Sequence, residues 1–133
     1  MSFDDDLDKY AEVIIKVAIN LQAGQPLWIG AMWGMATGVS VELAPLVRKL
    51  TKHAYLAGAA YVDVSWDDIH IHRMRLLYGG PEAVQSFPTW RMNSYIEHIN
   101  NGGAILGIST TQTSHLAGLD HRAVLADSPA STQ

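Results

Sequence analysis

The sequence contains no cysteine, so it can form neither a disulfide framework nor a thiolate site. Basic residues are also few, because nine Lys and Arg stand against thirteen Asp and Glu, for a formal net charge of −4. An acidic chain lacks the positive patch that attracts nucleic acid or an anionic membrane, and we expect neither partner. Long apolar runs are missing too, and none is long enough to cross a bilayer.

The chain has the composition of one globular domain. Its 133 residues are 48% hydrophobic and 17% charged, and a chain of this length can bury roughly two-thirds of its unfolded surface. The first residues, MSFDDDLDKY, are acidic where a secretory leader would be basic. We therefore predict a single domain over residues 1–127, a polar tail over 128–133, and a cytoplasmic location.

Short apolar segments alternate with helical patterns along the chain. We predict strands over Pro26–Met32, Tyr61–Trp66 and Ala104–Ser109. Helices are predicted from Asp4 to Leu21, from Val41 to Leu56, from Ile69 to Tyr78, after Pro88 as far as Asn101, and near Asp120–Ala126. This order predicts an α/β fold with a small, three-stranded, mostly parallel sheet in the order 2-1-3 and helices on both faces.

The pattern is clearest between Lys52 and Asp68. A helix closes there with Gly58 at its stop position, and a β-branched and aromatic strand follows. Asp67 and Asp68 then offer side-chain oxygens that can cap a helix beginning near Ile69. A helix, a strand and a new helix cap in close succession form the repeating element of an open α/β sheet.

The loop after the first strand is where an open α/β sheet usually binds a ligand. It contains Gly30, Gly34 and Gly38, but their spacing matches neither G-x-G-x-x-G nor the P-loop, and no Lys follows them. Close packing explains these glycines better than a phosphate site does. Met32 and Trp33 offer a further possibility, an apolar rim for a partner surface.

The other residue types that carry chemistry form no recognisable set. His70 and His72 are two positions apart, which places them on nearly opposite faces of a helix and disfavours a metal pair. Helix capping explains Asp63, Asp67 and Asp68 better than an acid/base pair does. No serine lies in a G-x-S-x-G elbow, and in this acidic setting the tryptophans suit a core or interface better than base stacking. We assign no catalytic, cofactor-binding or metal-ligating residue to this chain.

Four short segments occur in an order that is typical of one enzyme family. They are Leu7-x-x-Tyr10-Ala11 with Gly24-Gln25, Ala54-Tyr55-x-x-Gly58-Ala59, Val62–Trp66 with Asp67 and Asp68, and Leu116–Asp120. In these segments the chain resembles the N-terminal domain of the M29 family, the thermophilic metallo-aminopeptidases. The loop Ala31–Ser40 and the segment Thr111–Thr113 depart from the family pattern, which leaves the subfamily open and does not disturb the fold.

The resemblance implies a parent enzyme that removes N-terminal residues from peptides, with two divalent metals, zinc or cobalt, that activate water. The metal ligands of the family lie in a C-terminal domain that has no counterpart in this sequence. We interpret the chain as the non-catalytic N-terminal domain of such an enzyme, where it shapes the substrate cavity and the dimer. The expected partners are the C-terminal catalytic domain, the peptide substrate of the parent, and a second copy in a homodimer.

Two other hypotheses remain open at this point. The chain could be a standalone module that binds a small ligand at the Gly30–Gly38 loop, or a protein-interaction module that uses Trp33. The interpretation as a domain of a larger enzyme makes one further prediction, an exposed apolar surface where the partner domain would pack.

Overall fold

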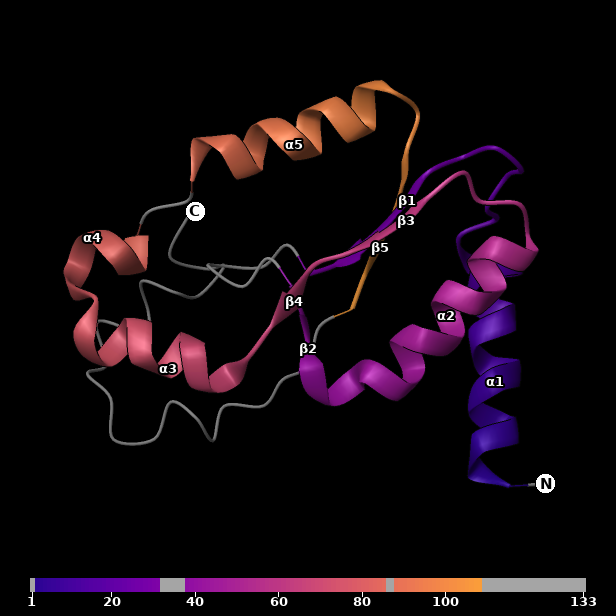
Figure 1. Cartoon of the computed structure of the whole chain (residues 1–133), viewed down its shortest axis with the longest axis horizontal. Coiled ribbons are helices and arrows are strands. Elements are labelled where there is room, and N and C mark those ends of the chain that lie inside the picture. Colours follow the sequence, from indigo (N-terminus) through magenta and orange to yellow (C-terminus); the bar gives the residue numbers. More distant parts are fainter. Residues whose placement is uncertain (1, 32–37, 86–87, 109–133) are drawn as a thin grey trace.

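The computed structural model describes residues 2–31, 38–85 and 88–108, in which helices and strands alternate (Figure 1). The helices are α1 (Phe3–Val13), α2 (Ala44–Leu56), α3 (Ile69–Tyr78), α4 (Gly80–Gln85) and α5 (Thr89–Asn100), with a π-helical turn η1 (Ile14–Ala18) and a 3-10 turn η2 (Val41–Leu43). The strands are β1 (Leu27–Gly30), β2 (Val39–Ser40), β3 (Val62–Val64), β4 (Trp66–Asp67) and β5 (Ala104–Gly107). No helix in these ranges is both long and apolar enough to cross a membrane.

The main sheet has three strands in the order β3-β1-β5, and both pairs are parallel. The predicted α/β class and strand order 2-1-3 are therefore confirmed. All four residues of β1 are buried, because the strand has a neighbour on each side and helices above and below. α1 and α2 cover one face of the sheet, and α5 lies on the other (Figure 1).

The predicted strand Tyr61–Trp66 is divided into two. β3 pairs with β1, and the Ser65 N–H still donates to the Ile29 carbonyl at 2.9 Å. Beyond that point the chain leaves β1, and β4 pairs in parallel with β2 as a separate two-stranded sheet. The sequence prediction missed β2, since a strand of two residues has no periodicity to detect.

The first helix is shorter than its apolar spacing predicts. α1 ends at Val13 and continues as the π-helical turn η1, and Asn20 then adopts a left-handed φ of 51° that ends the helical path. The wider turn changes which side chains face the core. Ile15 is fully buried, whereas Val17, which the helical spacing places on the inner face, is 73% exposed.

Side-chain caps define the starts of α1 and α3. Ser2 accepts a hydrogen bond from the Asp5 N–H, and Asp68 accepts one from the His70 N–H, each at 3.1 Å. Pro45 lies in the first turn of α2, where the missing N–H of proline breaks no helical hydrogen bond. The sequence does not predict the short helix α4, because Gly79-Gly80-Pro81 is typical of a helix end. The helical path is interrupted there, since Gly80 takes a left-handed φ of 74° between α3 and α4. The predicted helix near Asp120–Ala126 and the tail lie outside the described residues.

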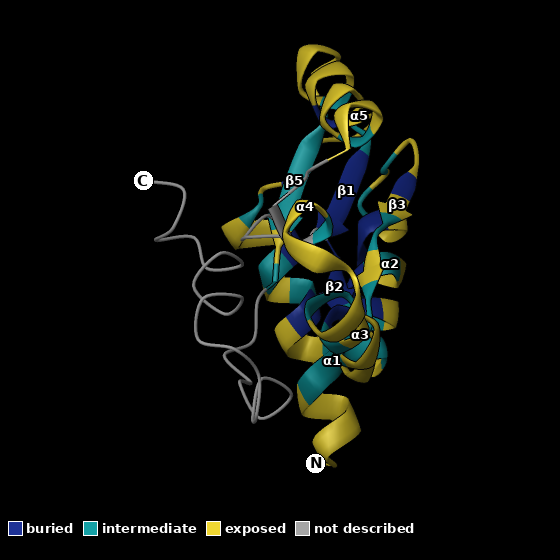
Figure 2. Ribbon diagram, turned by 90° about the vertical axis from the view of Figure 1, so that its left-hand side faces the viewer, coloured by how far each residue is buried: buried dark blue, intermediate teal, exposed yellow. Residues whose placement is uncertain are grey.

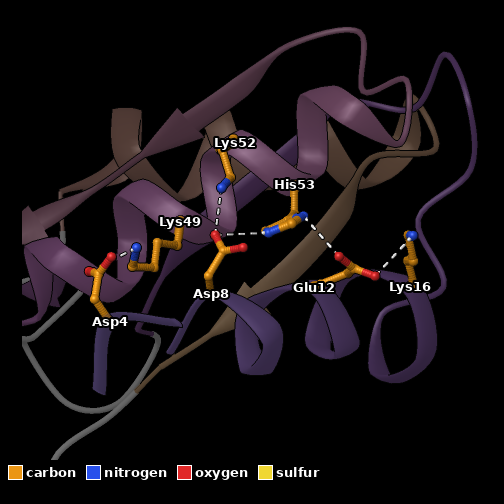
Figure 3. Close-up of polar contacts among 7 residues, drawn as sticks. All are labelled: Asp4, Asp8, Glu12, Lys16, Lys49, Lys52 and His53. Atoms are coloured by element: carbon orange, nitrogen blue, oxygen red, sulfur yellow. Dashed lines mark hydrogen bonds and ion pairs between the residues drawn. The ribbon is translucent and has the colours of Figure 1, made fainter. Parts of the chain in front are cut away.

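α1 and α2 pack together through buried apolar residues and through ion pairs at their edge (Figure 3). The carboxylate of Asp8 contacts Lys52 and lies 3.1 Å from Nε2 of His53, which is 6% exposed. Glu12 lies 3.8 Å from Nδ1 of the same histidine, so His53 is held between two carboxylates of α1. The hydrogen bond from Lys52 lowers the pKa of the Asp8 carboxyl; desolvation opposes this effect and His53 adds to it.

These contacts predict a pH-dependent stability. Because the pKa of Asp8 is lower in the folded chain, its ionised form stabilises the fold above the unfolded pKa, and this contribution is lost as pH falls through the folded pKa. Asp8→Asn should lower the Tm near neutral pH, and its difference from the wild type should shrink between about pH 5 and about pH 2. Calorimetry over this range measures the difference. Glu42→Gln is the control, and a difference for Asp8→Asn that stays constant with pH would contradict the assignment.

Candidate functional site

A groove with a volume of about 680 Å³ lies between α5 and the face of the sheet opposite α1 and α2. We call it the α5 groove. The sheet side contributes Pro26, Trp28, Tyr61, Asp63 and Ser65, and the helix side contributes Trp90, Arg91, Ser94, Tyr95, Glu97, His98 and Asn101. The volume is in the range of small-molecule and peptide sites, which makes this groove the candidate functional site.

The register of the sheet explains why these side chains meet. Trp28 on β1 is aligned with Asp63 on β3. Side chains alternate along a strand, so this row faces α5, whereas Leu27 and Ile29 face the opposite way and belong to the core against α1 and α2. The two faces of the sheet therefore differ in chemistry, one being aliphatic and the other aromatic and charged.

α5 contacts the sheet through the aromatic pair of Trp28 and Tyr95 and through a hydrogen bond of His98. The rings of Trp28 and Tyr95 have centroids 4.5 Å apart at an interplanar angle of 63°, an edge-to-face arrangement. Both side chains are buried, at 4% and 5% exposure. Nε2 of His98 lies 2.8 Å from the Ala104 carbonyl and connects the end of α5 to the start of β5. The burial pattern agrees, since most of α5 is exposed apart from this contact (Figure 2).

The polar groups of the groove serve structure or binding better than nucleophilic catalysis. Trp28 Nε1 donates to the Ser65 hydroxyl at 2.8 Å, and the Ser94 hydroxyl donates to the Arg91 carbonyl at 2.7 Å. Neither hydroxyl is paired with a histidine, which an activated nucleophile would need. Asp63 and Glu97 are exposed and form no ion pair with any described residue. The groove can therefore accept apolar and positively charged groups.

The predicted glycine loop is described at its two ends. Gly30 is the last residue of β1, and its carbonyl accepts a hydrogen bond from the Ile108 N–H at 2.7 Å. Gly38 lies against the backbone of β4, where an added Cβ would be 2.7 Å from the Asp67 nitrogen. Close packing therefore explains Gly38, as expected. Gly34, Met32 and Trp33 lie outside the described residues, as does Leu116–Asp120, the last of the four segments that carry the family resemblance.

The other candidate residues are separated by the fold. His70 and His72 lie on α3, as predicted; His72 is buried and His70 is exposed. Capping is confirmed for Asp68, whereas Asp67 lies in β4 and Asp63 lines the α5 groove. In the described ranges no three His, Asp or Glu side chains are placed to hold a metal ion, so this part of the chain does not fit a two-metal centre. No sequence motif indicates the α5 groove, because its residues come from positions 26 to 101.

Comparison with known proteins decides the family. A family model described as Peptidase_M29, thermophilic metalloprotease (M29), matches residues 3–133. The chain belongs to the M29 family. The M29 resemblance predicted from four short segments is therefore confirmed over nearly the whole chain.

The M29 relatives include named aminopeptidases. The chain is 33% identical to Aminopeptidase 2 of Geobacillus stearothermophilus over 122 residues, which cover 92% of this chain and 28% of that protein. It is 30% identical to Aminopeptidase T of Thermus thermophilus, covering 89% of this chain and 27% of the relative. The solved structure of wild-type AmpT from Thermus thermophilus matches with a TM-score of 0.80 at 28% identity, over 95% of this chain and 30% of that chain. The chain thus spans less than a third of the length of these relatives.

The packing of Gly38 predicts a large effect of a single methyl group. Gly38→Ala places a Cβ against the backbone of Trp66 and Asp67, which cannot move without disturbing the β2–β4 pairing. We expect the free energy of unfolding to fall by about 1–3 kcal/mol, measured by urea denaturation. Gly107→Ala is the matched control, because among the described residues its added Cβ meets only the Gly30 carbonyl oxygen, at 4.0 Å. Equal effects of the two substitutions would argue against close packing at Gly38.

The aromatic pair predicts that Tyr95 holds α5 on the sheet. Tyr95→Ala removes a buried ring and should lower the free energy of unfolding by about 3–5 kcal/mol. Tyr78→Ala is the control, because Tyr78 is 79% exposed on α3, and it should change the value by less than about 0.5 kcal/mol. Hydrogen exchange of the α5 amides distinguishes local release of the helix from global unfolding. Unchanged protection of α5 in Tyr95→Ala would contradict the role given to this contact.

Proposed function

We propose that this chain is the non-catalytic N-terminal domain of a metal-dependent aminopeptidase and that it helps to form the substrate cavity of that enzyme. The observation that carries the proposal is the M29 match over residues 3–133, together with a coverage of only 28% of Aminopeptidase 2. The named relatives are aminopeptidases, so the reaction proposed for the parent is removal of N-terminal residues from peptides.

The chemistry of the described residues supports different roles for this domain and for the catalytic domain of the parent enzyme. Bound divalent metals, which we propose to be two zinc or cobalt ions, would activate water and polarise the scissile carbonyl. The described part of this domain groups no three acidic or histidine side chains for that purpose. It instead offers an open groove with aromatic and carboxylate side chains. We therefore assign a role in shaping the substrate cavity to this domain and the metal ligands to the catalytic domain.

The proposed partners are the C-terminal catalytic domain, a peptide substrate of the parent, and a second copy in a homodimer. Exposed apolar side chains on two helices support extensive protein contacts. Ile71 and Tyr78 on α3 are 59% and 79% exposed, and Trp90 on α5 is 70% exposed. A cytoplasmic location is also proposed, supported by the absence of cysteine, since disulfides are rare in reducing compartments.

The proposal predicts where the activity resides. The product of the whole reading frame that encodes this chain should release p-nitroaniline from aminoacyl p-nitroanilides, lose this activity with a chelator, and regain it with zinc or cobalt. The chain alone should show no activity above the rate without protein. A spectrophotometric assay measures both. Chelator-sensitive activity of the chain alone, or an inactive product of the whole reading frame, would disprove the proposal.

A further inference from the structure

The described residues cover the second face of the parallel sheet only in part. Parallel sheets normally have both faces packed against other elements. Here α1 and α2 cover one face, whereas α5 contacts the other through Tyr95 on Trp28. The remainder of that face over β1 and β3 is open as the α5 groove, whose volume is about 680 Å³. A sheet face of this kind is completed by further polypeptide.

The side chains of the groove suit a protein surface better than a small ligand. Tyr61 and Trp90 stand on opposite sides of the groove and are 62% and 70% exposed. Aromatic side chains of this kind are enriched in protein interfaces. Small ligands of open α/β sheets bind beyond the carboxyl ends of the strands, whereas this groove also includes Pro26, Tyr61 and Asn101, which precede β1, β3 and β5.

Three charged side chains line the groove, the cation Arg91 and the carboxylates Asp63 and Glu97, so the groove carries an excess of negative charge. Asp63 and Glu97 are exposed in the groove and have no ion-pair partner among the described residues. Burial of two unpaired carboxylates would be costly, so an occupant that covers them must supply positive charge or hydrogen-bond donors. A segment with apolar side chains and a Lys or Arg meets both requirements.

We propose that the α5 groove is the surface on which the remainder of the M29 polypeptide docks, through a segment that packs apolar side chains between Tyr61 and Trp90 and a basic side chain against Asp63 and Glu97. The inference rests on the proposed function, because the occupant is the part of the enzyme outside this domain. More than two thirds of Aminopeptidase 2 lies outside the match, so the relatives have ample polypeptide to cover this face.

The absence of cysteine allows a direct test by thiol labelling. Ser94 lines the groove, and Ser94→Cys is nearly isosteric; Asn93 is exposed on the same helix outside the groove, and Asn93→Cys is the matched control. Labelling with iodoacetamide is followed by mass spectrometry of the α5 peptide, in the chain alone and in the product of the whole reading frame. In the chain alone the two cysteines should react at similar rates, and in the whole protein Ser94→Cys should react about tenfold or more slowly than Asn93→Cys.

Four outcomes would overturn the docking inference. Equal labelling of the two cysteines in the whole protein shows that the groove is open, and a reading frame that holds no further domain leaves the groove without its occupant. Protection that disappears on dilution makes a second copy the occupant, and protection that appears only with added peptide makes the groove a substrate subsite. The anilide assay tests the proposed function separately, since an inactive whole protein with a protected Ser94→Cys would contradict the function and retain the docking surface.

A second variant tests the same surface without a thiol. Trp90→Ala should change the Tm of the chain alone by less than about 2 °C, because the side chain is largely exposed there, and should lower the Tm of the whole protein by about 4 °C or more. Phe3→Ala is the control, because Phe3 is 80% exposed at the start of α1, far along the chain from the groove. Equal effects of Trp90→Ala in the two proteins would overturn the inference.

Discussion

The structure depends on the position of β1 at the centre of the sheet. Its backbone is bonded on both sides: the Leu27 N–H donates to the Tyr61 carbonyl at 2.9 Å, and the Ile108 N–H donates to the Gly30 carbonyl at 2.7 Å. Because alternate side chains point to opposite faces, β1 also fixes the character of each face. Leu27 and Ile29 enter the aliphatic core, and Trp28 points toward α5. A shift of one residue would exchange these faces, so the packing of α1, α2 and α5 all depends on this register.

The elements that local chemistry specifies could be predicted from the sequence. The cap at Asp68, the first-turn proline at Pro45 and the three apolar strands each depend on neighbouring residues, and the right-handed crossover rule then gives the strand order. The π-helical turn at Ile14–Ala18 could not be predicted in this way. Its benefit is the burial of Ile15 against other elements, which no local pattern reveals. The β2–β4 pair could not be predicted for the same reason, since Val39 pairs with Trp66, which is distant in the sequence.

The candidate site shows the limit of motif-based reasoning. The sequence singles out Gly38 and Asp68, and the structure gives both a packing or capping role. The α5 groove forms instead where Asp63 of the sheet and Glu97 of α5 come together, at positions that no spacing rule connects. Asp63 in particular looks like one of three capping carboxylates in the sequence, and only the register with Trp28 shows that it faces the groove. The family could nevertheless be predicted, because the resemblance depends on the order of four short segments along the chain and not on the residues of a site.

The two faces of the sheet differ in how the described residues cover them. The face toward α1 and α2 is closed by aliphatic contacts and gives the fold its core. The face toward α5 has one buried aromatic pair beside exposed carboxylates, a mixture that suits neither a dry core nor a fully solvated surface. Interfaces between domains have this intermediate polarity. The core is thus built from residues of the domain itself, whereas the groove has the composition of a surface that a neighbouring domain covers.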